Sequence, residues 1–173
     1  MNERISRVLA KMEEKGLKQL LVSDPLSIRF LTGIMVNPGE RLYALMLRTN
    51  GKHTFFFNYL YFVSNTGYEE VWFSDMDDQI AVLMEHIDMN ETLGIDKTWP
   101  ARFLIPLQER CPGLKTVWGS DCVDNVRACK NEEEIQITTL YDSLHHCYHR
   151  MWQKRRNSDY FKRRGTRSCC QRN

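Results

Sequence analysis

The clearest structural signal in the chain is the segment LYALMLRTNGKHTFFF, residues 42–57. Two apolar runs, residues 42–48 and 53–57, flank a turn that contains Asn50-Gly51. Asn-Gly is typical of tight hairpin turns, because both residues tolerate positive φ angles. We therefore predict that the two runs are paired antiparallel strands, with positive φ angles at the Asn-Gly step.

Strand and helix patterns alternate on both sides of this hairpin. An amphipathic helix is predicted near the start of the chain, capped by Asn2 and ended by Gly16, with one apolar face made by Ile5, Val8, Leu9 and Met12. Further strands are predicted at residues 19–23, 71–73, 92–96 and 114–119, and further helical segments at residues 28–31, 80–87 and 100–111. This order predicts an α/β fold with a mixed β-sheet flanked by helices.

The charge of the chain changes sharply along its length. Residues 1–137 carry 15 Lys and Arg against 20 Asp and Glu, a net charge of −5, whereas residues 138–173 carry 9 against 2, a net charge of +7. Such a step indicates a change in the kind of segment. We predict one domain over residues 1–129, the start of a linker helix over 130–137, and a basic tail over 138–173 that is disordered or the product of a shifted reading frame.

The composition also predicts the compartment. No apolar run approaches the ~20 residues that a membrane helix needs, so we predict a cytoplasmic protein with no membrane contact. The 6 cysteines form no C-x-x-C pair, and a disulfide framework is not expected in a reducing compartment. Cys111, Cys122 and Cys129 are interpreted as small buried side chains.

The tail contains two patterns with a possible function. The cluster of His145, His146, Cys147 and His149 could hold zinc, but it lacks companion ligands, and we favour coincidence. The basic runs 154–156 and 162–164, with aromatic residues between them, could track phosphates and stack bases. We prefer a solvated, disordered extension, with weak nucleic-acid binding at low salt as the alternative.

Two acidic clusters could hold a metal, or could cap helices and form turns. They are Asp75, Asp77 and Asp78 in one segment and Asp121 and Asp124 in another. Both lie where we place the ends of secondary-structure elements. Short acidic side chains commonly bond backbone N–H groups at such positions, so we interpret them as caps and turns.

The loop Asn37-Pro38-Gly39-Glu40-Arg41 places two opposite charges directly before a predicted strand. Taken alone, such a loop is an exposed connection with a local ion pair, which contributes ~0–1 kcal/mol. The segments around it change this interpretation.

Six segments, in this order, resemble the amino-terminal domain of the creatinase and prolidase family of Xaa-Pro peptidases. They are residues 4–20, 21–24, 28–33 (IRFLTG), 38–41 (PGER), 94–96 (GID) and 126–135 (VRACKNEEEI). The resemblance implies a mixed sheet flanked by helices. In full-length members a pita-bread domain follows, with Asp, His and Glu ligands for two divalent metals such as manganese, cobalt or zinc.

The sequence after Ile137 departs from the family pattern, and we interpret the chain as cut off before that metal centre. We therefore predict no catalytic residue, no metal ligand and no cofactor in this chain, and no Xaa-Pro hydrolysis by the chain alone. One alternative is that the chain pairs with a separately encoded catalytic half. Another is that it is a binding module whose basic tail contacts nucleic acid.

The resemblance also implies a role for Glu40 and Arg41. In prolidase-like dimers the corresponding loop lies near the active site of the other subunit, where an Arg can contact the substrate carboxylate through two donors. The implied partners are a second copy of the chain or a peptidase catalytic domain, with proline-containing peptides as substrates of the intact protein.

Overall fold

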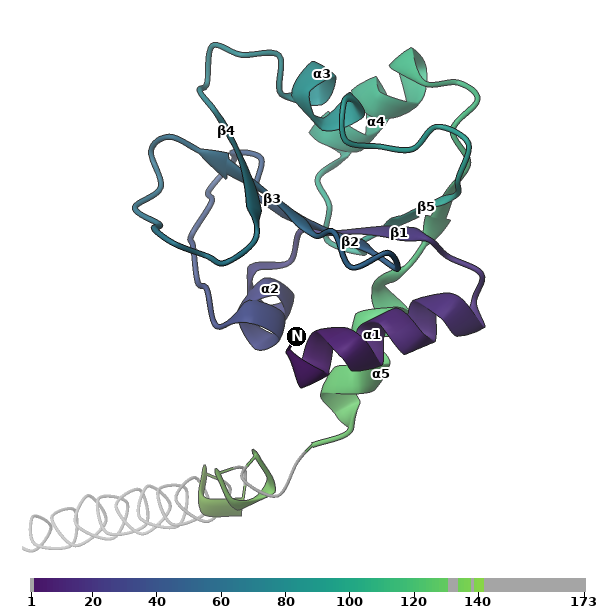
Figure 1. Ribbon diagram of the computed structural model, residues 1–173. Helices are drawn as coiled ribbons and strands as arrows, with labels where there is room; N and C mark the ends of the chain where they lie inside the picture. The colour runs from purple at the N-terminus through teal and green to yellow at the C-terminus, as the bar shows by residue number, and fades with distance from the viewer. Residues whose placement is uncertain (1, 131–133, 138, 142–173) are drawn as a thin grey trace, which may run out of the picture. The chain divides into compact units, whose positions relative to one another are not determined.

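The computed structural model describes residues 2–130, 134–137 and 139–141 (Figure 1). The chain divides into two compact units, Met1–Cys129 and Lys130–Asn173. The described residues 134–137 and 139–141 of the second unit are helical. The zinc-ligand cluster at 145–149 and the basic runs at 154–156 and 162–164 lie outside the described residues, and so does almost all of the predicted tail.

The first unit alternates helices and strands. The helices are α1 (Glu3–Glu14), α2 (Pro25–Thr32), α3 (Gln79–Met84), α4 (Ala101–Arg110) and α5 (Ser120–Ala128). The strands are β1 (Gln19–Val22), β2 (Ala44–Arg48), β3 (Thr54–Asn58), β4 (Glu69–Phe73), β5 (Leu93–Ile95) and β6 (Thr116–Trp118). Among the described residues, no helix has both the length and the apolar character needed to cross a membrane.

The strands form one mixed sheet in the order β4-β3-β2-β1-β5-β6. Strand β2 is antiparallel to both of its neighbours, and the other neighbouring pairs are parallel. Five strands therefore point one way and β2 points the other, which confirms the predicted fold class. The start of β2 consequently lies at the same edge of the sheet as the carboxyl ends of the other strands.

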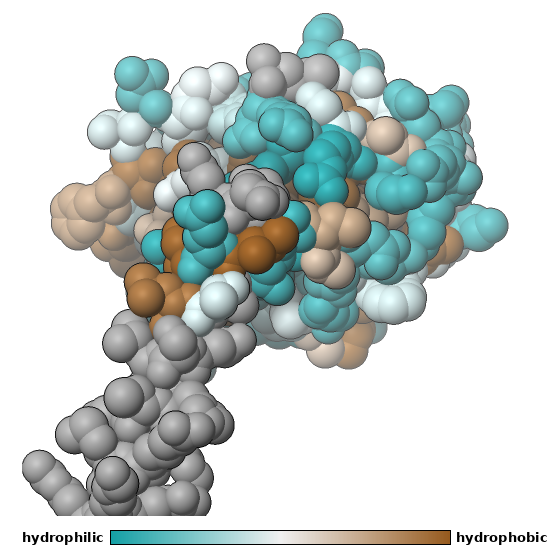
Figure 2. All heavy atoms as spheres, turned by 90° about the horizontal axis from the view of Figure 1, so that it is seen from below, coloured by the Kyte–Doolittle hydropathy of each residue, from teal (hydrophilic) through white to brown (hydrophobic). Residues whose placement is uncertain are grey.

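Helices cover both faces of the sheet (Figure 1). Residues of α1, α2 and α5 share one buried cluster with Leu20 and Val22, and residues of α3 and α4 share the other with Leu21. Alternate residues of β1 thus enter opposite layers, as strand geometry requires. Figure 2 looks onto the side that carries α1, α2 and α5, where hydrophilic residues cover much of the surface and hydrophobic ones gather in separate patches. This is the pattern of amphipathic helices that bury one face.

The predicted hairpin is confirmed, but its turn differs from the prediction. Ala44 pairs with Phe56 across β2 and β3. Gly51 has φ 80°, and its N–H donates to the Arg48 carbonyl at 3.0 Å. Asn50 is not among the residues with positive φ, so the prediction was wrong at this position. Its side-chain oxygen instead accepts from the Lys52 N–H at 3.0 Å.

The sequence patterns missed one helix and misplaced the end of another. Helix α5 was not predicted, and Asp121 and Asp124 lie inside it rather than in a turn, where they pair with Lys15 and Lys97. Helix α3 ends at Met84, earlier than predicted. The predicted burial holds for Cys111 and Cys122 and is wrong for Cys129, which is exposed.

Close packing of β1, β5 and β6 depends on two glycines. A Cβ at Gly119 would lie 2.5 Å from the Leu20 Cδ1 and 3.1 Å from the Gly94 Cα. We expect Gly119→Ala to lower the free energy of unfolding by about 1–3 kcal/mol, the usual cost of overpacking a core. Gly113→Ala is the matched control, because a Cβ there has no neighbour within 4 Å. Urea unfolding curves should separate the two variants, and equal midpoints would contradict this explanation.

His53 makes the stability of the fold depend on pH. Its Nδ1 accepts from the Arg48 N–H at 3.3 Å, and the ring is only 7% exposed. Burial, followed by the positive charge of Arg48, lowers the pKa of His53 below its ordinary value of 6.5. As the pH falls, His53 is therefore protonated in the unfolded chain at a higher pH than in the folded chain. Stability from neutral His53 is complete above pH 6.5 and is lost as the pH falls toward the folded-state pKa.

We expect His53→Asn, which keeps an acceptor but does not titrate, to flatten the pH dependence of unfolding just below pH 6.5. Urea midpoints measured in steps from pH 7.5 downward test this. Curves of equal slope for the parent chain and the variant would show that another group controls the acid response.

Candidate functional site

Arg41 is held in one orientation by Asp75. Its Nε lies 2.9 Å from both carboxylate oxygens of Asp75, and its Nη2 lies 2.9 Å from Oδ2. Asn58, the last residue of β3, donates its side-chain N–H to Asp75 Oδ1 at 2.7 Å. The loop before β2 is thereby tied to the ends of β3 and β4. The hydrogen bond between the pair lowers the pKa of Asp75 and raises that of Arg41.

This pairing corrects the interpretation of the first acidic cluster. Asp78 does cap α3, by accepting from the Ala81 N–H at 3.2 Å, and Asp77 accepts from the Ser74 N–H at 2.6 Å in a turn. Asp75 neither caps a helix nor closes a local turn. It bonds a guanidinium 34 residues away in sequence, and no local pattern could reveal that contact.

Glu40 has a different partner from Arg41. One carboxylate oxygen of Glu40 lies 3.2 Å from Nη1 of Arg102 in α4, and the Glu40 side chain is 91% exposed. Glu40 and Arg41 therefore do not form the local ion pair considered for the loop. Each of them pairs with a residue that is distant in sequence. Both pairs, together with Gln79, line a polar surface hollow of about 350 Å³.

Asp75 uses only one edge of the Arg41 guanidinium. A guanidinium has five N–H donors, and Asp75 contacts the edge formed by Nε and Nη2. Among the described residues, no hydrogen-bond partner is found for Nη1. The end formed by Nη1 and Nη2 therefore keeps donors for a second acceptor, and a carboxylate matches that geometry.

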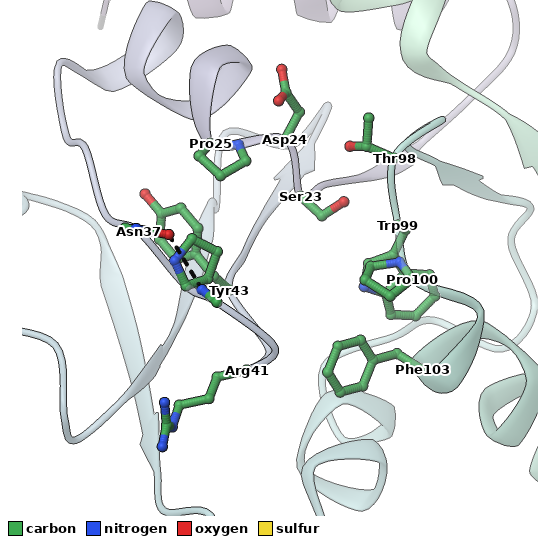
Figure 3. A pocket seen from close by; sticks show the side chains of 12 residues that line it. Ser23, Asp24, Pro25, Asn37, Arg41, Tyr43, Thr98, Trp99, Pro100 and Phe103 are labelled. Carbon is green, nitrogen blue, oxygen red and sulfur yellow. Dashed lines mark hydrogen bonds between the residues drawn. The ribbon is translucent and has the colours of Figure 1, made fainter.

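A second pocket lies beside this hollow and shares Arg41 with it. Its volume is about 310 Å³, and it is built from the loops after β1 and β5, the loop before β2 and the start of α4 (Figure 3). The carboxyl ends of parallel strands are the usual place for ligand sites in α/β sheets. Its lining residues are Ser23, Asp24, Pro25, Asn37, Pro38, Gly39, Arg41, Tyr43, Thr98, Trp99, Pro100 and Phe103.

Asp96 organises this edge of the sheet. The residue is 7% exposed, and its Oδ2 accepts from the backbone N–H groups of Ser23 at 3.1 Å and Asp24 at 3.0 Å. Its Oδ1 accepts from the Thr98 N–H and the Ser120 hydroxyl, both at 3.2 Å. One carboxylate thus joins the ends of β1 and β5 to the start of α5. Asp96 appears among the sequence patterns only as the last residue of the GID segment, and its place directly after a buried strand is a usable signal for a site residue.

Within the described ranges, no group of three or more His, Cys, Asp or Glu is placed to hold a metal ion. The residues of this unit therefore do not match the di-metal ligand set that the resemblance implies for the following domain. No chemical step is assigned to a metal in the described part of this chain.

These features define an α/β domain with a mixed six-stranded sheet and a charged loop at the carboxyl edge of that sheet. A model of the creatinase/prolidase N-terminal domain matches residues 4–129, and the chain belongs to this family. The resemblance noted in the sequence is confirmed. A comparison with curated proteins gave no match.

Solved structures show the same fold. The N-terminal domain of an X-Pro dipeptidase from Streptococcus pyogenes is 16% identical with a TM-score of 0.62, over 72% of this chain and 99% of that one. Dipeptidase PepE from Mycobacterium ulcerans is 25% identical with a TM-score of 0.66, and the prolidase from Thermococcus sibiricus is 25% identical with a TM-score of 0.67. The match covers 77% and 78% of this chain, respectively, and 38% of each of those longer chains.

Proposed function

We propose that this domain recognises the substrate end and contacts the partner subunit in an Xaa-Pro peptidase, with Glu40 and Arg41 at the point of contact. The observation that carries the proposal is the orientation of Arg41. Asp75 holds one edge of its guanidinium and leaves donors on the Nη1 and Nη2 end for a carboxylate. The family and the peptidases among its structural relatives supply the substrate class.

The chemistry of Arg41 suits the free carboxylate at the end of a short peptide. A guanidinium stays protonated at physiological pH and matches both carboxylate oxygens, whereas an ammonium acts as a point charge. Asp75 fixes the side chain before the substrate arrives, so less side-chain entropy is lost on binding. Hydrolysis itself is assigned to the catalytic domain, where bound divalent metals such as manganese, cobalt or zinc would activate water.

Exposed apolar side chains at the same edge of the sheet support a subunit contact. Tyr59, Leu60 and Phe62 follow β3, and Met76 follows β4 next to Asp75. Phe62 and Met76 are almost fully exposed, at 105% and 93%. Aromatic residues and Met are enriched in protein interfaces, and several such side chains around a charged loop fit a docking surface for a second subunit or a catalytic domain.

The proposal is tested by grafting this domain onto the catalytic domain of a related Xaa-Pro dipeptidase and measuring hydrolysis of an Xaa-Pro dipeptide. We expect a working enzyme that depends on Arg41. A folded graft whose activity is independent of that residue would contradict the proposal.

The alternatives from the sequence remain predictions. A separately encoded catalytic half would use the same Arg41 site, and would be recognised by activity that appears only when the two chains are mixed. Nucleic-acid binding through the runs at 154–156 and 162–164 involves residues outside the described part of the chain. Salt-dependent retention on a polyanion that persists without residues 1–129 would favour it.

A further inference from the structure

The pocket between the β1 and β5 loops contains an unusual concentration of unpaired polar groups. In the described part of the chain, five buried side-chain polar atoms have no hydrogen-bond partner. Three of them belong to residues that line this one pocket: Ser23 Oγ, Tyr43 Oη and Trp99 Nε1. The three residues are only 8%, 3% and 7% exposed, respectively.

Unpaired polar groups of this kind need an explanation. Folded proteins pair the large majority of their buried polar atoms, and each unpaired one costs about 1–3 kcal/mol. The Tyr43 hydroxyl is turned away from Ser23 and Trp99 (Figure 3), so the two groups on the facing loops, Ser23 Oγ and Trp99 Nε1, are the ones that indicate a site for hydrogen-bonding groups of another molecule. Ser23 and Trp99 come from the loops after β1 and β5, which Asp96 holds together through the Ser23 N–H. Their positions are therefore fixed by the sheet.

The hydrogen-bond donors of the pocket determine which polar group the ligand must carry. The indole N–H of Trp99 can only donate, so its partner must be an acceptor. The Ser23 hydroxyl can donate to the same acceptor or to a neighbouring one. Figure 3 shows Ser23 between two walls, with Asn37 and Tyr43 on one side and Thr98, Trp99 and Phe103 on the other.

The walls of the pocket determine the size and apolar character of the rest of the ligand. Pro25, Pro38, Pro100 and Phe103 contribute apolar surface, and the rings of Trp99 and Phe103 stack with centroids 6.3 Å apart. A volume of about 310 Å³ is at the lower end for small-molecule sites and many times that of one water molecule. The pocket therefore fits a compact apolar group that carries an acceptor oxygen.

The charges around the pocket favour a neutral ligand. The charged residues in its lining are Asp24, which pairs with Arg127, and Arg41, which pairs with Asp75 and keeps its remaining donors at the edge of the pocket. Figure 3 shows the Arg41 guanidinium at the edge of the pocket, turned away from Ser23 and Trp99. A carboxylate placed against those two side chains would lose its hydration without gaining an opposite charge.

We infer that this pocket binds a small neutral amide, a carbonyl oxygen attached to a compact apolar body, through Trp99 Nε1 and the Ser23 hydroxyl. The site is separate from the end of Arg41 assigned to the substrate carboxylate. It lies within this chain and requires neither a catalytic domain nor a second subunit.

Nuclear magnetic resonance of the full chain tests the inference. The sequence has 4 tryptophans, so the indole N–H signal of Trp99 can be assigned as the one lost in Trp99→Phe. N-acetyl-leucinamide is the neutral probe, and N-acetyl-leucinate is the matched carboxylate. We expect the amide to shift the Trp99 signal in a saturable way. The exposed Trp118 should not respond, and the carboxylate should bind at least about tenfold more weakly because no positive charge faces Ser23 and Trp99.

Two variants separate the inference from the proposed function. Ser23→Ala should weaken amide binding about three- to tenfold, the effect of one lost hydrogen bond, with the backbone spectrum otherwise retained. Arg110→Ala, at a surface residue that does not line the pocket, should leave amide binding unchanged. Absence of a saturable shift, equal binding of the carboxylate, or full affinity in folded Ser23→Ala would each overturn the inference. None of these results would affect the role proposed for Arg41.

Discussion

Replacing Asp96 by Ala is expected to lower the free energy of unfolding of this domain by about 3 kcal/mol, because several hydrogen bonds to one buried carboxylate are lost together. Two of these bonds come from the Ser23 and Asp24 N–H groups where β1 ends, and another comes from Ser120 at the start of α5. In the variant these donors lose their acceptor, and no other acceptor takes the place of the Asp96 carboxylate. The loops that form the pocket should loosen first.

Urea unfolding at neutral pH measures this effect, with Asp124→Ala as the control. Asp124 pairs with Lys97 on the surface, and an exposed pair of this kind contributes ~0–1 kcal/mol. Asp96→Asn keeps one acceptor oxygen and should fall between the two. If the Asp96 and Asp124 variants lost the same stability, Asp96 would not be the residue that joins β1, β5 and α5.

Replacing Arg41 by Ala should lower kcat/KM of the grafted peptidase by about 10- to 100-fold, which corresponds to about 1–3 kcal/mol of charge-assisted hydrogen bonding. Arg41→Lys should recover little, because an ammonium cannot present two parallel donors. The stability of the domain should barely change in either variant, since Arg41 and Asp75 are 41% and 45% exposed.

Arg110→Ala is the matched control for this prediction. Arg110 is 44% exposed and also pairs with an Asp of the same segment, Asp78, but it lies at the end of α4 and does not line the hollow around Glu40. The Arg110→Ala substitution should leave kcat/KM of the grafted peptidase unchanged. Asp75→Asn should give a smaller loss than Arg41→Ala, seen mainly as a higher KM, because the guanidinium is present but no longer fixed. Equal losses for Arg41→Ala and Arg110→Ala would point to a general effect of surface charge.

The sequence was informative where apolar periodicity was strong. Local apolar patterns predicted the hairpin, helix α1 and the alternation of strands and helices. The apolar residues of these patterns are buried in the two core clusters. Helix α5 was missed because its sequence, SDCVDNVRA, contains mostly poor helix formers. It is stabilised by tertiary contacts through Cys122, Val123 and Val126, which lie in the same buried cluster as α1 residues.

The candidate sites depend on contacts between distant segments, which local patterns do not encode. Glu40 and Arg41 were found through the family resemblance, but their partners Arg102 and Asp75 lie 62 and 34 residues away. The pocket around Ser23 and Trp99 forms only because β1 and β5 are parallel neighbours in the sheet. That pairing requires the complete strand order, and a single sequence gives little information about it.

Mixed dimers of the grafted enzyme would test most directly whether Arg41 of one subunit serves the active site of the other. One chain would combine Arg41→Ala with an intact catalytic domain, and the other would combine Arg41 with a catalytic domain inactivated at its metal ligands. We expect each to be weak or inactive alone and the mixture to regain activity, because the intact catalytic domain meets Arg41 of its partner. A mixture in which heterodimers form but activity stays at the level of the separate chains would contradict the assignment of Arg41 to recognition across the subunit contact.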